Sequence, residues 1–228
     1  MNPPPGLQNP PIAHRGLWRS GGTPENSLAA FEAACNAGYG IELDVRLSAD
    51  GEAMVFHDDC LDRMTVESGL MEERTADDLA SLRLLGSTQT IPTLLQALDL
   101  VAGRALVLVE LKTPPGQEGL LEARVTELLA SYQGPVGLLS FNADALTWMA
   151  RHAPGLPRGL NIQAADQIQG TETACPDFLS VCVDLAGAPQ VQTWRLTGRV
   201  VAWVARSPGD RARLRPLVDN VMFEGFNP

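Results

Sequence analysis

Acidic side chains stand two residues apart at the ends of two apolar segments of the chain. Glu42 and Asp44 form one pair, and Glu110 stands two residues before Lys112 in the other. Side chains two apart on a β-strand share a face, so each pair projects together. Three carboxylates that converge where strands end repel one another, and a hard divalent cation relieves that repulsion. Oxygen ligands favour Mg²⁺, Ca²⁺ or Mn²⁺ over zinc, and the alternative for each pair is a salt bridge at a strand end.

Two of the three histidines close segments that we predict to be extended. His14 ends a short strand and His57 ends an extended piece, whereas His152 ends a predicted helix and is expected at the surface. Two imidazoles beside carboxylates suit acid–base work on a phosphodiester, because one removes a proton from the nucleophile and the other protonates the leaving alkoxide. Arg15 can contact a phosphate oxygen bidentately. The alternative for each histidine is a structural role.

The elements that must position these residues alternate between strand and helix. We predict strands at 11–14, 40–47, 105–111, 135–140, 158–162, 177–183, 199–205 and 220–225. We predict helices at 27–38, 93–103, 118–132, 142–152, 189–197 and 208–217, with 163–176 less regular. Eight strands, most followed by a helix, favour a single (β/α)₈ TIM barrel over residues 1–228. The polar segment 58–91 is predicted to be a small insertion after the second strand.

The charge balance restricts the partners that this chain can bind. The 228 residues carry a formal net charge of -10, so an acidic surface repels nucleic acid and anionic membranes, and we expect neither as a stable partner. An anionic phosphodiester must then be neutralised locally. Of the 17 basic residues, Lys112 is the single lysine, and it stands beside Glu110.

The remaining composition predicts a cytoplasmic protein. Residues 1–11 have no apolar core and are not expected to be a signal peptide, and no stretch of the chain is apolar enough to span a membrane. The four cysteines are scattered without a C-x-x-C pair, so we expect reduced thiols. The oligomeric state has no signature in the sequence.

Taken together, these motifs resemble a known family in their order and spacing. They are Ile12-Ala-His-Arg-Gly16, Pro24-Glu-Asn-Ser27, Ile41-Glu-Leu-Asp-Val45, His57-Asp58, Leu61-x-Arg63-x-Thr65, Ile91-Pro-Thr-Leu94, Glu110-Leu-Lys112 and Ser140-Phe-Asn142. This series resembles the glycerophosphodiester phosphodiesterase family, densely over residues 12–142. The joint match is far more specific than any single motif in it.

The resemblance implies a barrel enzyme that hydrolyses glycerophosphodiesters to an alcohol and sn-glycerol 3-phosphate. It implies one divalent metal ion, Mg²⁺ or Ca²⁺ with Mn²⁺ as an alternative, on Glu42, Asp44 and Glu110. It implies that His14 and His57 are the general acid and base, in an order that the sequence leaves open. Arg15 and Lys112 would then contact the phosphate.

The last third of the chain departs from the family pattern. The family carries a W-T-V-N-like seventh strand where this chain has Trp203-Val-Ala-Arg206. Trp203 is expected to line the glycerol end of the site, with a core position as the alternative. Glu224 stands where the family has an aspartate. These departures predict a head-group pocket that differs from the family's usual one.

Two other functions fit parts of the pattern. A relative of the bacterial phosphoinositide-specific phospholipases C would stop at a cyclic phosphate, but the sequence has no apolar or basic patch for a lipid surface. A non-catalytic module that binds glycerophosphodiesters would not need two strand-end imidazoles. Turnover of a glycerophosphodiester separates the enzymes from the module.

Overall fold

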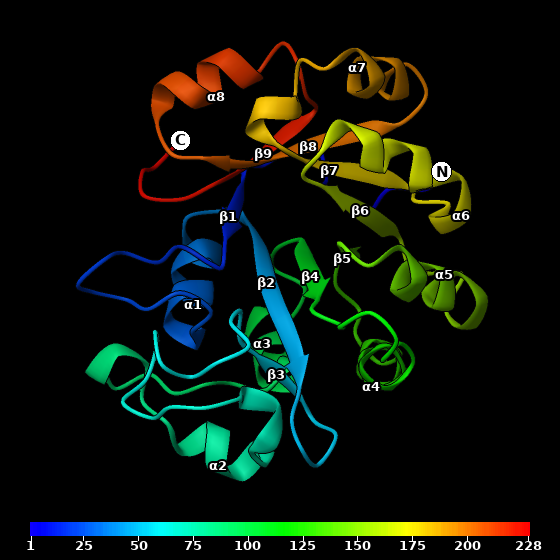
Figure 1. The fold of residues 1–228 in the computed structure, drawn as a ribbon. Coiled ribbons are helices and arrows are strands. Elements are labelled where there is room, and N and C mark those ends of the chain that lie inside the picture. Colours follow the sequence, from blue (N-terminus) through cyan, green and yellow to red (C-terminus); the bar gives the residue numbers. More distant parts are fainter.

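The computed structural model describes the backbone of residues 1–228 and the side chains of all of them except 169, 170 and 172. A nine-stranded sheet closes on itself (Figure 1). Among the described strands, eight pair in parallel and form a barrel, and the ninth pairs antiparallel with one of them at the side. The predicted (β/α)₈ TIM barrel with a small insertion after the second strand is confirmed.

The strand register already brings candidate site residues together. The strands are β1 (Ile12–His14), β2 (Gly40–Leu47), β3 (Ala53–Val55), β4 (Val107–Leu111), β5 (Val136–Ser140), β6 (Arg158–Ile162), β7 (Phe178–Cys182), β8 (Arg199–Ala205) and β9 (Asn220–Phe223). Their order in the barrel is β1-β9-β8-β7-β6-β5-β4-β2, with β1 paired back to β2, and the antiparallel β3 is added beyond β2. His14 lies opposite Glu42 in the β1–β2 pair, and Asp44 lies opposite Glu110 in the β2–β4 pair. Residues that are distant in sequence therefore become neighbours at the carboxyl ends of adjacent strands.

Helices cover the outside of the barrel. They are α1 (Leu28–Asn36), α3 (Leu94–Val101), α4 (Leu120–Leu129), α5 (Ala143–His152), α6 (Thr171–Ala174), α7 (Pro189–Arg195) and α8 (Pro208–Leu214), while α2 (Ala76–Ser81) lies in the insertion. Ser27 caps α1 and Thr93 caps α3, both through side-chain acceptors, as their residue types favour. α8 ends at Leu214, before the predicted residue 217, because Pro216 has no amide hydrogen with which to continue the helical hydrogen bonds. None of these helices, across the residues described, is both long and apolar enough to cross a membrane.

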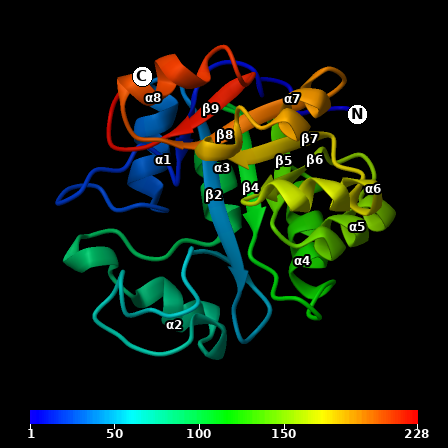
Figure 2. The same cartoon turned by 45° about the horizontal axis from the view of Figure 1, so that its top comes forward.

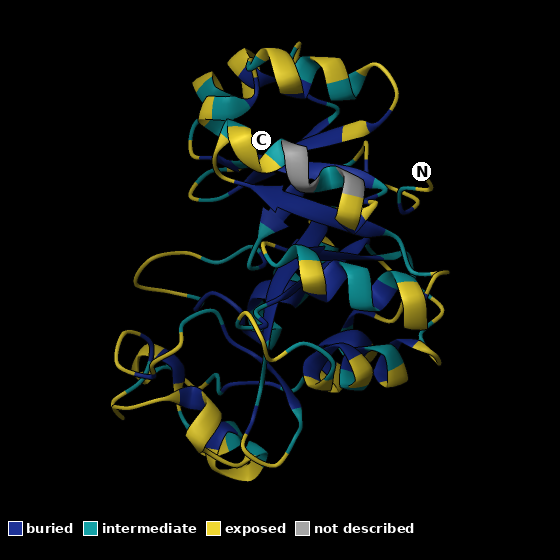
Figure 3. Cartoon of the chain, turned by 45° about the vertical axis from the view of Figure 1, so that its right-hand side comes forward, coloured by how far each residue is buried: buried dark blue, intermediate teal, exposed yellow. Residues whose placement is uncertain are grey.

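The barrel interior is apolar at the end where the strands begin. Figure 3 shows the buried strands at the centre and the exposed outer faces of the helices. Inside the barrel, an apolar cluster fills that end; it comprises Leu7, Ile12, Leu106, Leu108, Leu139, Phe178, Val201 and Met222. Leu7 comes from the N-terminal segment, and Asn220 holds that segment by donating to the carbonyls of Leu7 and Pro10 at 2.8 Å. The other end of the barrel remains available for a polar site.

The insertion between β3 and α3 packs mainly on itself. It contains two short 3₁₀ turns, Met71–Glu73 and Leu84–Gly86, and the helix α2. Its apolar cluster comprises Phe56, Leu61, Met64, Met71, Leu79, Leu84 and Ile91, together with Met54 of β3. In Figures 1 and 2 this cyan-to-green segment lies to one side of the barrel. The exact extent of the insertion, 58–91, stays a prediction, as does the assignment of 1–228 as one domain.

Candidate active site

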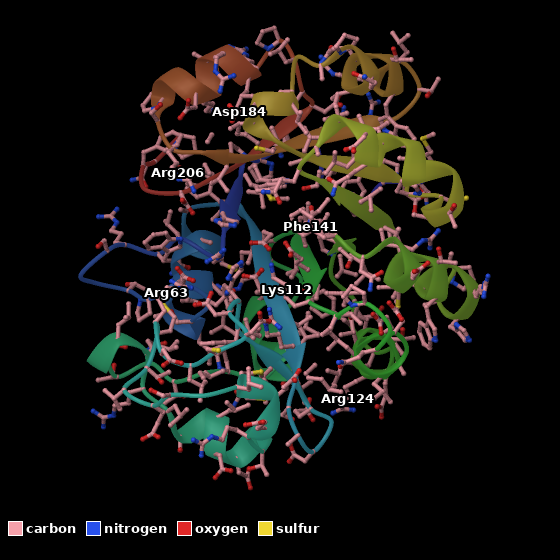
Figure 4. The ribbon with its side chains drawn as sticks, viewed as in Figure 1. Arg63, Lys112, Arg124, Phe141, Asp184 and Arg206 are labelled. Atoms are coloured by element: carbon pink, nitrogen blue, oxygen red, sulfur yellow. The ribbon has the colours of Figure 1, made fainter. Side chains whose placement is uncertain are left out.

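One cavity of about 410 Å³ opens at the carboxyl ends of the strands. All eight residues that the sequence singled out line it: His14, Arg15, Glu42, Asp44, His57, Glu110, Lys112 and Trp203. They come from β1, β2, β4 and β8, and from the segments that directly follow β1, β3 and β4. Figure 4 shows Lys112 and Phe141 pointing toward the centre of this region. The structure thus brings together every residue of the predicted site.

The three carboxylates form a compact buried cluster. One oxygen from each of Glu42, Asp44 and Glu110 lies within 4.8 Å of the others. Burial raises the pKa of Glu42 well above its ordinary value, and the charges of Asp44 and Glu110 raise it further. Glu42 Oε1 is buried without a hydrogen-bond partner among the described residues. An oxygen cluster of this size with an unpartnered acceptor fits a hard divalent cation.

Two cations offset part of this negative charge. Lys112 Nζ lies 3.0 Å from Asp44 Oδ1 and also contacts Glu110, while Arg15 Nε lies 3.3 Å from Asp44 Oδ2. Burial alone would raise the pKa of Asp44, but Lys112 and Arg15 hold it below its ordinary value. Burial alone would lower the pKa of Lys112, but Asp44 and Glu110 raise it. The aspartate is therefore ionised and the lysine charged at neutral pH.

The backbone after β1 presents Arg15 to this cluster. Arg15 has φ of 59° and Gly16 has φ of 80°, so both are in the left-handed region. A Cβ on Gly16 would come within 2.8 Å of Ala30, so only glycine fits there. The turn lets the Arg15 amide donate to Glu42 Oε2 at 3.0 Å, while its guanidinium lies 2.7 Å from Glu25. Arg15 is thus fixed by both its backbone and its side chain.

His14 is held by a carboxylate from the other end of the chain. Its Nδ1 lies 2.7 Å from Glu224 Oε2, and its Nε2 lies 4.0 Å from Glu42 Oε2. Arg206 Nε donates to the second oxygen of Glu224 at 2.8 Å. Burial would raise the pKa of Glu224, but His14 and Arg206 lower it to about 2. The carboxylate is ionised and fixes the orientation of the imidazole.

His57 has a similar arrangement built from nearby residues. Its Nδ1 lies 2.6 Å from Asp58 Oδ1, and Arg63 Nε donates to Asp58 Oδ2 at 2.6 Å. Burial would raise the pKa of Asp58, but Arg63 and His57 lower it to about 2. Burial lowers the pKa of His57 itself. Arg46 also donates to the His57 carbonyl at 2.8 Å, which ties this segment to β2.

The aromatic wall of the cavity is formed by Trp203 and Phe141. Their rings meet edge to face with centroids 5.5 Å apart. Trp203 Nε1 donates to the Ser180 carbonyl at 3.1 Å, so the indole has one fixed orientation. Trp203 therefore lines the cavity while also packing on the interior cluster of the barrel.

Several residues at the site were not singled out from the sequence as site residues. Glu25 and Asn26 lie inside a quoted motif, and Asn26 donates to Asp44 Oδ2 at 2.8 Å. Asp58 follows His57 directly, so adjacency was a usable signal. Glu224 was noted only as a departure, because nothing local links it to a histidine 210 positions away.

Comparison with known proteins places the chain in a family. Residues 14–220 match the glycerophosphoryl diester phosphodiesterase family. The chain is 35% identical over 166 residues to a glycerophosphodiester phosphodiesterase of Caldanaerobacter subterraneus, with 67% of this chain and 66% of the relative aligned. Alignments to this and three other curated relatives cover only 51 to 66% of those proteins.

Solved structures share the fold over nearly the whole chain. An Oleispira antarctica phosphodiesterase in complex with the product sn-glycerol-3-phosphate has a TM-score of 0.85 and 30% identity, covering 93% of this chain and 91% of the other. A glycerophosphodiester phosphodiesterase from Thermotoga maritima has a TM-score of 0.78 and 25% identity, covering 93% and 92%. The chain belongs to the glycerophosphoryl diester phosphodiesterase family.

Proposed function

We propose that this chain is a phosphoric diester hydrolase that converts glycerophosphodiesters to an alcohol and sn-glycerol 3-phosphate. The observation that carries the proposal is one cavity holding two imidazoles, two cations and a cluster of three carboxylates. Family membership supports the proposal, and so does the product bound to the Oleispira antarctica phosphodiesterase. The substrate is a small molecule, and a cytoplasmic location stays a prediction.

The carboxylate cluster is proposed to hold one divalent ion, Mg²⁺ or Ca²⁺, with Mn²⁺ as the alternative. Glu42, Asp44 and Glu110 would be its ligands, supported by their closeness and by the unpartnered oxygen of Glu42. When bound, such an ion neutralises a phosphate oxygen and lowers the pKa of the attacking hydroxyl or water. Asn26 and the Arg15 amide orient two of the carboxylates through hydrogen bonds.

Arg15 and Lys112 are proposed to bind the phosphate. Both line the cavity and are mostly buried, so their interaction with an anion is weakly screened by solvent. Arg15 offers a planar donor pair, and Lys112 offers a point charge. The two side chains therefore hold the phosphodiester beside the carboxylate cluster.

His14 and His57 are proposed to transfer the protons. Each uses Nδ1 to contact a carboxylate, which leaves Nε2 for the substrate. One imidazole removes a proton from the nucleophile, which is water or the 2-hydroxyl of the glycerol. The other donates a proton to the oxygen of the leaving alcohol. Phosphorus NMR during turnover distinguishes the two nucleophiles, because attack by the 2-hydroxyl passes through a cyclic phosphate.

Release of choline from glycerophosphocholine tests the proposal directly. We expect hydrolysis with an added divalent ion and its loss in excess EDTA. A cyclic phosphate as the final product would instead favour the lyase chemistry of the phospholipase C-like barrels. Binding of glycerophosphocholine without any turnover across a panel of divalent ions would reduce the chain to a binding module.

A further inference from the structure

Across the cavity from the charged residues, β6 and β7 present uncharged polar side chains. In the closed strand order, β6 lies opposite β1 and β7 lies opposite β2. Asn161 on β6 lines the cavity and is 4% exposed, and its register partner on β7 is Ser180. Ser180 faces the interior as well. It lies two residues from both Phe178 of the interior cluster and Cys182 of the cavity wall, and residues two apart on a strand share a face. The two walls of the site therefore differ in charge.

The Asn161 carboxamide has no hydrogen-bond partner among the described residues. The other two buried asparagines of the described chain are fully engaged. Asn26 donates to Asp44 Oδ2 and accepts from its amide, and Asn220 donates to two carbonyls and accepts from the Val221 amide. The Asn161 amide atoms are not among the fully buried unpartnered atoms of the described residues, so they are open to the cavity. A ligand in the cavity can therefore supply the partners that the protein does not.

A second polar group without a partner lies beside it. Ser180 Oγ is buried and makes no hydrogen bond with the described residues. The Ser180 carbonyl accepts from Trp203 Nε1, which places the indole next to this polar pair. An aromatic ring beside an amide is a suitable surface for a polyol, because the ring packs on C–H groups while the amide hydrogen-bonds a hydroxyl.

The hydrogen-bonding groups of the Asn161 carboxamide indicate which part of a phosphodiester it can bind. It offers both a donor and an acceptor, which matches a hydroxyl that also does both. A phosphate oxygen only accepts, and it is better served by Arg15 and Lys112 on the opposite wall. An ammonium only donates and would leave the amide donor unpartnered. The hydroxyl is thus the group that satisfies Asn161 most completely.

We propose that Asn161 is a substrate-binding residue that hydrogen-bonds an alcohol hydroxyl of the phosphodiester, and that it forms a polyol subsite with Trp203. This assignment rests on the proposed function. The hydroxyl belongs either to the glycerol half or to the leaving alcohol, and both have the same hydrogen-bonding chemistry.

Substitution of Asn161→Leu tests the subsite, because leucine keeps the approximate volume and removes both polar groups. We would measure kcat/KM on glycerophosphoglycerol, on glycerophosphocholine and on bis(p-nitrophenyl) phosphate, which has no aliphatic hydroxyl. We expect a loss of at least about 100-fold on a hydroxylated diester and a change below about threefold on bis(p-nitrophenyl) phosphate. Loss on both glycerophosphodiesters assigns the glycerol half, and loss on glycerophosphoglycerol alone assigns the leaving alcohol.

Asn220→Leu is the matched control, because Asn220 is also buried but fully partnered and lies outside the cavity. It should lower Tm and leave the ratio between the three substrates unchanged. Equal changes on all three substrates with Asn161→Leu, or no change on any, overturn the proposal.

A second measurement keeps the subsite testable if the proposed function fails. Calorimetry would compare the binding of glycerophosphoglycerol with that of dimethyl phosphate, a diester without hydroxyls. The subsite predicts that the wild type prefers the hydroxylated diester by at least about tenfold and that Asn161→Leu removes this preference. An unchanged preference in the variant, or none in the wild type, rejects the subsite. Absence of all hydrolysis by the wild type would reject only the proposed function.

Discussion

The two histidines of the site are held in the same way by two differently built regions. Each imidazole contacts a carboxylate through Nδ1, and each carboxylate is held by an arginine: Asp58 by Arg63, and Glu224 by Arg206. We call His57, Asp58 and Arg63 the His57 arm, and His14, Glu224 and Arg206 the His14 arm. The His57 arm is local, because its carboxylate is the next residue in the chain. The His14 arm exists only because β1 pairs with β9, which brings residues 210 positions apart into contact.

The two arms also differ in the other contacts that their arginines make. Arg63 additionally contacts Glu25 at 2.7 Å, and Glu25 contacts Arg15. The His57 arm is therefore linked to Arg15, which is proposed to bind the phosphate. The Arg206 side chain is 67% exposed and forms its ion pair with Glu224, while the Arg206 backbone amide donates to Asp210 Oδ2 at 3.1 Å. In Figure 4, Arg63 lies at about the height of Lys112, and Arg206 lies above both. The two imidazoles therefore make the same kind of carboxylate contact, but the arginine of the His57 arm has more ion-pair partners than the arginine of the His14 arm.

The largest effect should come from removing either imidazole. His14→Ala and His57→Ala should each lower kcat on glycerophosphocholine by at least about 100-fold, because each transfers one of two protons. His152→Ala is the control, since His152 is exposed and distant from the cavity, and it should retain wild-type kcat. Near-normal turnover in either cavity variant would remove that histidine from the mechanism.

The carboxylates behind the imidazoles should come next. Asp58→Asn and Glu224→Gln keep the shape of each side chain but remove the charge that fixes the histidine. We expect each to lower kcat by about 10–100-fold, with little change in KM. The two losses in kcat should be of similar size if the two carboxylates orient their histidines equally well. A loss confined to Asp58→Asn would show that the contact from Glu224 has no role in turnover.

The arginines should separate the arms. Arg63→Ala should lower kcat by about tenfold and also raise KM, because Arg63 supports Asp58 and, through Glu25, Arg15. Arg206→Ala should change kcat by about threefold or less, as expected for an exposed ion pair. Arg83→Ala, in the same insertion as Arg63, is the control. Equal KM for Arg63→Ala and the wild type would contradict a link to Arg15.

The smallest effect concerns stability at low pH. The pKa values of Asp58 and Glu224 are lowered to about 2, below their values in the unfolded chain. The stability that they contribute is present above about pH 4 and is lost as the pH falls toward 2. Each amide variant should therefore have a Tm about 2–4 °C below that of the wild type at pH 6, with the gap shrinking below about pH 4 and closing near pH 2. A gap that stays constant would show that these carboxylates are not specially stabilised.

The comparison of the arms also shows what the sequence can and cannot predict. Spacing of two along a strand placed Glu42 with Asp44, and adjacency could have placed Asp58 with His57, because both are local rules. The pairing of His14 with Glu224 depends on barrel closure, which no local pattern encodes. For the same reason, the packing of Leu7 inside the barrel and the unpartnered amide of Asn161 emerged only from the fold.

The boundaries of helices and strands also divide into those that the local sequence predicts and those that depend on the fold. The predicted strands at 40–47, 158–162 and 199–205 match β2, β6 and β8. β8 is an almost continuous apolar run, whereas β2 and β6 alternate apolar residues with polar residues or glycine, and both patterns are typical of strands. The predicted strand at 220–225 ends at Phe223, two residues before Gly225, whose φ of 78° turns the chain. The less regular segment 163–176 contains a 3₁₀ turn and α6. Short elements of this kind depend on tertiary contacts more than on their own pattern.

A crystal structure with Ca²⁺ and sn-glycerol 3-phosphate would show whether the carboxylates and histidines form one site. We expect one ion within about 2.6 Å of an oxygen from each of Glu42, Asp44 and Glu110. We also expect the phosphate to lie between the two cavity histidines. An ion outside this cluster, or a phosphate out of reach of both imidazoles, would contradict a single site.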